Sequence, residues 1–124
     1  MRHEALLLAT SNTIEEEARV RIGEHELCCF ASRGRPAGLG RRYTVDLSLE
    51  DLGGWQVEDL GDVDVEPRVT PTGVGFGYVL VGRLDGARLD AGVVFEAQIF
   101  ADEYAHLSGK TVRVHVDRIG IDFL

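Results

Sequence analysis

The sequence predicts an all-β protein, mainly β with one or two short helices, that folds as a small curled antiparallel barrel. Apolar and polar side chains alternate with a period of two in several segments, glycine-containing turns separate these segments, and few residues follow a helical period. Such a pattern is typical of small barrels and curled sandwiches, and we prefer the barrel. We expect one barrel-like domain over residues 1–124, because this length suits one domain and no linker divides it.

The clearest element is a β-hairpin over residues 76–98, centred on Asp85-Gly86. This dipeptide tolerates the positive φ of a type I′ turn. A two-residue loop places Leu84 opposite Ala87 and makes every facing pair on one side of the hairpin apolar. The other side carries most of the charged residues, so we expect it to face solvent.

The C-terminal segment alternates in two phases that differ by one residue. The apolar positions are first even and then odd: Val112, Val114, Val116, Ile119, Ile121 and Phe123. A strand changes faces only through a bulge or a bend, which the sequence places at Asp117-Arg118. Bulged terminal strands are typical of small curled barrels.

Further strands are expected upstream. Alternation over residues 18–22, a turn at Gly23-Glu24 and an apolar run over residues 27–31 predict a second hairpin. Residues 43–49 predict one more amphipathic strand, and residues 4–10 fit either a short strand or a helical turn.

Helix is scarce in the predicted fold. The best candidate spans residues 101–108, with Asp102 as its cap and Gly109 at its end. A weaker candidate begins at Ser48 and breaks at Gly53-Gly54. The whole arrangement loosely resembles an OB-fold, a five-stranded Greek-key barrel, although that fold usually places its helix before two final strands. This resemblance concerns architecture alone.

Charge and cysteine content limit the function classes. The net charge is −8, which disfavours non-specific nucleic-acid binding unless positive charge is concentrated locally. No apolar run is long enough for a membrane span or a signal peptide. Cys28 and Cys29 are adjacent and would form a disulfide only with a distorted peptide. We therefore expect a cytoplasmic protein with free thiols.

Positive charge is concentrated in the arginine loop, residues 31–42, which contains no acidic residue and three glycines. Guanidinium groups bind phosphate or carboxylate, and aromatic rings at the loop ends, Phe30 and Tyr43, could stack on bases. The preferred alternative is a flexible, solvated connection between strands. The candidate binding residues of this region are Arg33, Arg35, Arg41, Arg42 and Tyr43.

Negative charge is concentrated in residues 46–66, which hold eight acidic and no basic residues. The candidate binding residues here are Asp59, Asp62, Asp64 and Trp55. Such a surface would imitate a nucleic acid or bind a basic protein. The alternatives are a solvated strand edge for the acids and a cap on the core for the tryptophan. A calcium loop is disfavoured, because further ligands at fixed offsets and a central glycine are missing.

The residue patterns predict no catalytic site, no metal and no cofactor. His25, Cys28 and Cys29 are poorly spaced for zinc, and no nucleophile elbow accompanies the four histidines. Gly73-x-Gly75-x-Gly77 leads into a strand rather than a helix, so it is a poor phosphate loop.

The preferred function is a non-enzymatic protein-binding domain with an acidic docking surface, comparable to an adaptor or a toxin-neutralising immunity protein. Its expected partner is another, basic protein, and no membrane is involved. The first alternative is an OB-like domain that binds single-stranded nucleic acid through residues 33–43, which the net charge opposes. The second is an enzyme with a site of dispersed residues and no assignable reaction. The sequence also leaves open whether the protein forms a homodimer, through an uncovered sheet edge near the C-terminal strand.

Overall fold

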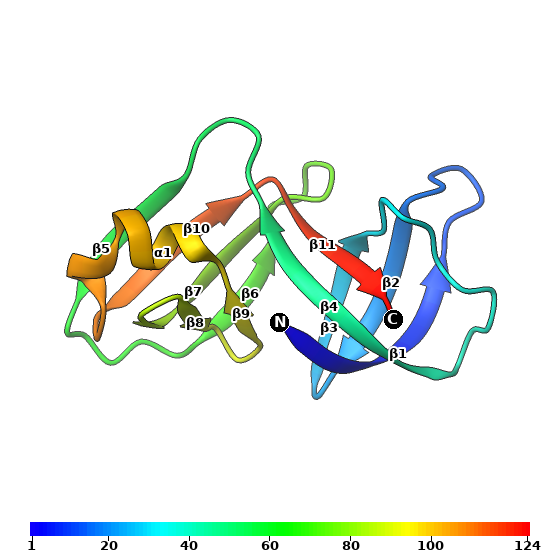
Figure 1. The fold of residues 1–124 in the computed structure, drawn as a ribbon, viewed down its shortest axis with the longest axis horizontal. Helices are drawn as coiled ribbons and strands as arrows, with labels where there is room; N and C mark the ends of the chain where they lie inside the picture. The colour runs from blue at the N-terminus through cyan, green and yellow to red at the C-terminus, as the bar shows by residue number, and fades with distance from the viewer.

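The computed structural model describes residues 1–124 and consists of a closed barrel beside a second β-sheet (Figure 1). The barrel strands are β1 (Arg2–Thr10), β2 (Glu17–Ile22), β3 (His25–Phe30), β4 (Arg42–Glu50) and β11 (Arg118–Phe123). The sheet strands are β5 (Gln56–Gly61), β6 (Arg68–Pro71), β7 (Tyr78–Asp85), β8 (Arg88–Asp90), β9 (Val94–Glu96) and β10 (Thr111–Val116). The expected all-β fold with a small barrel is confirmed.

The barrel has a Greek-key arrangement. Strands β1, β2 and β3 pair in succession, and β4 returns along a longer connection to pair with β1. Strand β11 then closes the barrel between β4 and β3, antiparallel to β4 and parallel to β3. The β2–β3 hairpin has the expected turn, where Gly23 adopts a φ of 59°. This five-stranded closed barrel agrees with the OB-like architecture that the sequence predicts.

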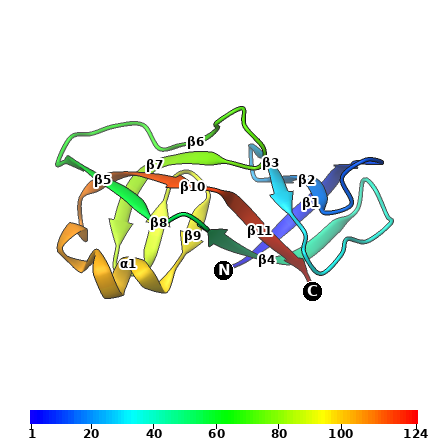
Figure 2. The ribbon, with the colours of Figure 1, turned by 90° about the horizontal axis from the view of Figure 1, so that it is seen from above.

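The second sheet has the strand order β5-β10-β7-β8-β9, and β6 pairs with β7 beside β8. Helix α1 (Gln98–Glu103) and the 3₁₀ turn η1 (Ala105–Leu107) lie over one face of this sheet (Figure 2). The side chain of Phe100 anchors α1, because it is completely buried in the core. Leu107 fixes η1 in the same way.

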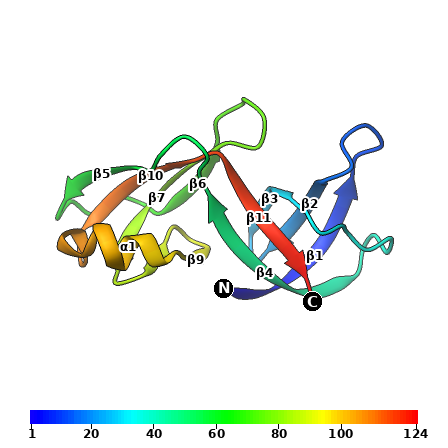
Figure 3. The ribbon, with the colours of Figure 1, turned by 45° about the horizontal axis from the view of Figure 1, so that its top comes forward.

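The whole second sheet is inserted between two neighbouring barrel strands. The chain leaves the barrel after β4 and returns through β10, which continues into β11 with only Asp117 between them (Figure 3). The Asp117 N–H donates to the Glu50 carbonyl at 3.0 Å, so both crossings lie side by side. The predicted change of face at Asp117-Arg118 is therefore confirmed, and its cause is the passage of the chain from the sheet into the barrel.

The hairpin around Asp85-Gly86 exists, but its predicted register is wrong. Leu84 pairs with Leu89 and Asp85 with Arg88, two residues away from the expected pairing. A shift by two keeps each side chain on its own face of the sheet, so the expected apolar face is still the buried one. The hairpin is also shorter than expected, because the chain turns back after β8 and forms β9.

Several other expectations need correction. Helix α1 begins at Gln98 and has no side-chain cap, so Asp102 does not cap it. The weak helix at Ser48 does not form, because Ser48 lies within β4. Residues 4–10 belong to strand β1. Strands β5 and β6 were not predicted, because their acidic and proline-containing sequences lack a clear alternation.

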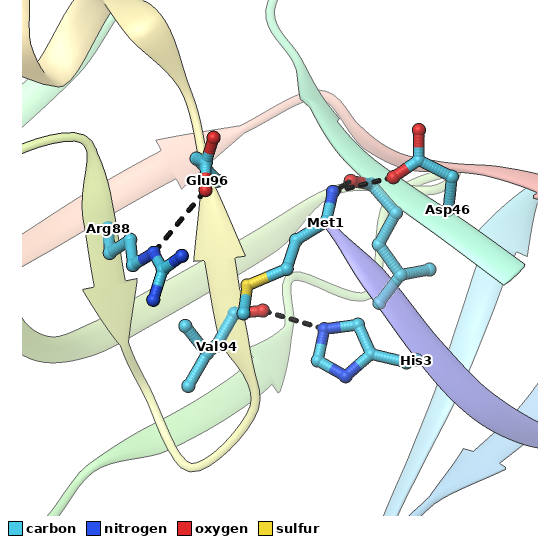
Figure 4. A network of polar contacts seen from close by, with 7 residues as sticks. Met1, His3, Asp46, Arg88, Val94 and Glu96 are labelled. Carbon is cyan, nitrogen blue, oxygen red and sulfur yellow. Dashed lines mark hydrogen bonds and ion pairs between the residues drawn. The ribbon is translucent and has the colours of Figure 1, made fainter.

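The barrel and the sheet share one hydrophobic core of 25 buried residues. Polar contacts also join them: the Cys28 N–H donates to the Tyr78 hydroxyl at 2.7 Å. His3 Nε2 lies 2.8 Å from the Val94 carbonyl oxygen and so connects β1 to β9 (Figure 4). None of the helical segments has the length and apolar character that crossing a membrane would require.

Candidate functional site

The arginine loop connects β3 to β4 at the end of the barrel. One of its arginines, Arg35, forms hydrogen bonds within the protein. The Arg35 guanidinium donates hydrogen bonds to the carbonyls of Ser11 (2.7 Å) and Ile14 (3.3 Å) in the β1–β2 connection and to that of Glu17 (2.5 Å), the first residue of β2. It therefore holds the two connections together and has few donors left for an anion. The other three arginines, Arg33, Arg41 and Arg42, are exposed.

The aromatic residues at the ends of this loop also contact other parts of the protein. The ring of Phe30 packs edge-on against Phe76, and the Arg118 guanidinium carbon lies 4.0 Å from the centre of its ring. The Tyr43 hydroxyl donates to the Gly38 carbonyl at 3.0 Å, and its ring packs edge-on against Phe123. Neither ring lies open as a stacking platform for a base.

A shallow depression of about 400 Å³ lies beside the loop. Arg33, Arg35 and Tyr43 line it. Arg41 and Arg42 do not line it. The five candidate residues of this region therefore form two groups, one that lines the depression and one, Arg41 and Arg42, that lies outside it.

Four of the eight acidic side chains of residues 46–66 have a positive partner. The N-terminal amino group lies 2.6 Å from Asp46 Oδ1 (Figure 4). Glu50 forms an ion pair with Arg118, Glu58 with Arg113 at 2.9 Å, and Asp59 with Lys110 at 3.9 Å. All of these pairs are partly solvated, so each contributes little to stability.

Three carboxylates stand apart, those of Asp62, Asp64 and Glu66. They lie in the acidic connection, residues 62–67 between β5 and β6, and are exposed without an ion pair. The Thr111 hydroxyl donates to the Val63 carbonyl at 3.0 Å and fixes this connection against β10. The candidates Asp62 and Asp64 are thus presented to solvent, whereas Asp59 is held by its lysine.

Asp62 and Asp64 line a cleft of about 330 Å³. Its other walls come from the connection and from three strands of the sheet: Val63, Val65, Pro67, Arg83, Asp90 and Thr111. Arg83 is exposed and lines the same cleft as the acidic residues, without an ion pair to them. No cluster of three or more histidine, cysteine or acidic side chains has an arrangement that would hold a metal ion.

Trp55 immediately precedes β5 and is partly buried. Its ring packs edge-on against Phe100 of α1, with 5.7 Å between the ring centres. The indole therefore covers one end of the core, as the cap alternative expects.

Neither cysteine has the properties of a nucleophile. Burial raises the pKa of the Cys29 thiol strongly, and this side chain has no exposed surface. Burial and the nearby Glu17 carboxylate, which accepts a hydrogen bond from the thiol at 3.6 Å, raise the pKa of Cys28. Because only the thiolate is reactive, both residues are suited to packing rather than to catalysis.

A further cleft of about 340 Å³ lies where the barrel meets the sheet, and no residue pattern predicts it directly. Asp51, Thr72, His115 and Asp117 line it. The loops around it contain Gly53-Gly54 and the Gly73-x-Gly75-x-Gly77 motif, so these glycines were the only available signal. The Asp51 and Asp117 carboxylates are occupied, because they accept backbone hydrogen bonds from Gly53 and Leu52.

Charge is distributed unequally between the two parts of the molecule. Residues 51–117, which form the sheet and its helix, contain 12 acidic and 5 basic residues. The barrel segments, residues 1–50 and 118–124, contain 9 acidic and 8 basic residues. The barrel is therefore nearly neutral, and almost all of the net negative charge belongs to the inserted sheet.

Comparisons with curated proteins and with solved structures found no match. A family model described as "Uncharacterised conserved protein UCP019853" matches residues 1–124. The match spans the barrel, the inserted sheet and both charged regions. The chain therefore belongs to the family of uncharacterised conserved proteins UCP019853.

Proposed function

We propose that this protein is a non-enzymatic protein-binding domain, in which the barrel is the scaffold and the inserted sheet carries an acidic docking surface for a basic partner. The concentration of negative charge on the sheet carries the proposal. A surface of one sign steers a partner of opposite sign and repels like-charged molecules. A nearly neutral barrel adds little to this field, so the attraction is directed to one end of the molecule.

The acidic connection is the centre of the proposed surface. Asp62, Asp64 and Glu66 lack positive neighbours within ion-pair distance, so their charge is available to a partner. Glu58 and Asp59 of the preceding strand β5 are partly neutralised by their ion pairs. Substitution within the connection should therefore weaken binding more than substitution of Glu58 or Asp59.

The single-strand nucleic-acid alternative has less support. Arg35 and both aromatic rings at the ends of the arginine loop already have partners within the protein. Only Arg33, Arg41 and Arg42 are exposed there, and the molecule as a whole has a net charge of −8. An enzymatic function has no catalytic cluster to support it.

The test is affinity capture from a lysate of the organism that encodes the protein, at low salt, with and without nuclease. A triple variant, Asp62→Asn, Asp64→Asn and Glu66→Gln, removes the charge of the acidic connection. A matched control, Glu15→Gln, Glu16→Gln and Glu24→Gln, removes the same charge from barrel loops. We expect a protein partner that resists nuclease and dissociates with salt, because salt screens exposed charges.

The two variants should then differ in how much of the partner they recover. Recovery of the partner should fall about tenfold or more with the connection variant, since three partner contacts of a few tenths to one kcal/mol each are lost. Recovery should change little with the barrel control. Equal recovery with both variants would contradict the acidic docking surface, and nuclease-sensitive recovery would support the arginine loop instead.

A further inference from the structure

The outer edge of β5 is a free sheet edge. Strand β5 is the outermost strand of the sheet (Figure 2) and pairs with β10 alone. No backbone N–H or C=O of β5 bonds to a strand other than β10, and within β5 the Gly61 N–H donates to the Asp59 carboxylate at 2.7 Å. One row of its peptide groups is therefore available to another strand.

The strand register identifies the available groups. The Lys110 carbonyl accepts from Leu84 of β7, so even-numbered residues along β10 direct their backbone groups to β7 and odd-numbered ones to β5. Arg113 pairs with Glu58 and therefore bonds it. The alternate residues of β5, Val57 and Asp59, direct their N–H and C=O groups outward.

The other edges of the sheet are less suited to accept a strand. At β9, the Val94 carbonyl oxygen already has a hydrogen-bond partner, the ring nitrogen of His3 in the barrel (Figure 4). Strand β6 has four residues and ends at Pro71, which has no N–H to donate. Strand β5 has six residues and contains no proline.

The charge on this edge determines which strand fits. Glu58 and Asp59 are exposed on β5 and keep part of their charge, because Arg113 and Lys110 neutralise them only partly. Residues 43–67 contain no basic residue. Antiparallel pairing of two copies of β5 would bring these carboxylates together, which is destabilising. A basic strand would instead place its cations beside them. The edge is thus protected against self-association and complementary to a basic segment.

We infer that β5 accepts an extended basic segment of a partner protein as an additional strand, bonded through the backbone groups of Val57 and Asp59. The inference rests on the proposed function and specifies how the basic partner is held. Backbone pairing would supply affinity, and the carboxylates of β5 and of the acidic connection would supply the preference for basic side chains.

A synthetic eight-residue peptide of alternating lysine and valine, capped at both ends, is the direct probe. Its control has the same side chains and charges with every backbone nitrogen methylated, so it cannot donate a backbone hydrogen bond. Amide hydrogen exchange of the full-length protein, followed by NMR at low salt and millimolar peptide, is the measurement. We expect the Val57 and Asp59 amides to become protected with the first peptide and not with the second. Equal binding of both peptides, or no added protection at these amides, would overturn the inference.

A pair of variants tests the same edge from the protein side. Asp59→Pro removes one outward N–H, and proline is tolerated on edge strands where the N–H faces solvent. Asp59→Ala removes the same charge and the same acceptor for the Gly61 N–H, and it keeps the outward N–H. Affinity for the lysine–valine peptide should be about tenfold lower in the proline variant than in the alanine variant, the usual effect of losing one hydrogen bond. Equal affinities would overturn strand addition.

The failure of this inference differs from failure of the proposed function. If the connection variant weakens peptide binding while the methylated peptide binds normally, the acidic surface stands and strand addition falls. If the connection variant binds the peptide as well as the parent protein does, and the peptide still protects the Val57 and Asp59 amides, strand addition is supported. The docking role of the connection is then wrong.

Discussion

Arg35 connects two loops of the barrel through a single guanidinium group. Two of its acceptor carbonyls belong to the connection between β1 and β2 and the third to the first residue of β2, whereas its own backbone belongs to the connection between β3 and β4. A charged donor that bonds partly buried carbonyls contributes more than a neutral one. The residue is therefore a structural element of this end of the barrel.

Replacement of Arg35 with alanine should lower the free energy of unfolding by about 1–3 kcal/mol, because three carbonyls lose their donor. Urea denaturation followed by circular dichroism measures the change. The control is Arg33→Ala, which removes an exposed arginine from the same loop and should alter stability by less than about 0.5 kcal/mol. If both variants were equally stable, the assigned bonds would not contribute to folding.

The sequence predicted the location of charge at this scale but not the partners of individual residues. Counting arginines over residues 31–42 reveals a basic loop. It cannot reveal that Arg35 reaches Ser11 and Glu17, which lie between β1 and β2 and at the start of β2, since such contacts depend on the closed barrel. The same limit applies to Asp59 and Lys110, which β5 and β10 bring together.

Strands β7 and β8 approach unusually closely at Gly82. A Cβ atom on this glycine would lie 1.9 Å from the carbonyl oxygen of Asp90 and 2.9 Å from the Cα of Ala91. Both are backbone atoms, so they cannot move aside as a flexible side chain can. The end of β8 and its turn into β9 depend on the absence of a side chain here.

Gly82→Ala should therefore lower the free energy of unfolding by about 3 kcal/mol or prevent folding. Gly53→Ala is the matched control, because its Cβ would meet no atom closer than 4.0 Å. It should change stability by about 0.5 kcal/mol or less. Thermal unfolding of both variants checks this, and a stable Gly82→Ala protein would contradict the close approach.

Elements with strong alternation could be predicted, and elements defined by neighbours could not. The alternation in β2, β4 and β10 identified those strands, because one face of each is buried. Strand β5 has no regular pattern of burial, since it is an edge strand with acidic residues. The hairpin register failed because two registers differing by two residues bury the same face, and the turn chemistry did not distinguish them.

The common core makes the barrel and the sheet mechanically dependent on each other. The 25 core residues form one cluster, and Tyr78 of the sheet accepts a hydrogen bond from Cys28 of the barrel. The chain also crosses between the two parts at adjacent points, Glu50 and Asp117. Neither part can lose its structure without exposing apolar surface of the other.

Both parts should therefore unfold in one transition. Trp55, the single tryptophan, reports on the sheet by fluorescence, and amide exchange at Ala18 and Val20 reports on the barrel. The free energies of unfolding from the two probes should agree within error in urea. Separate transitions would show that the barrel and the sheet are independent folding units.

The position of the inserted sheet has a consequence for synthesis on the ribosome. Strand β11, which closes the barrel between β3 and β4, follows the entire sheet in the chain. While residues 51–117 emerge, the first four barrel strands remain an open sheet whose two edges, β3 and β4, are unpaired. Chaperones that bind exposed strands would have their longest opportunity during this interval, and a ribosome stalled before Arg118 would release a chain whose barrel cannot close.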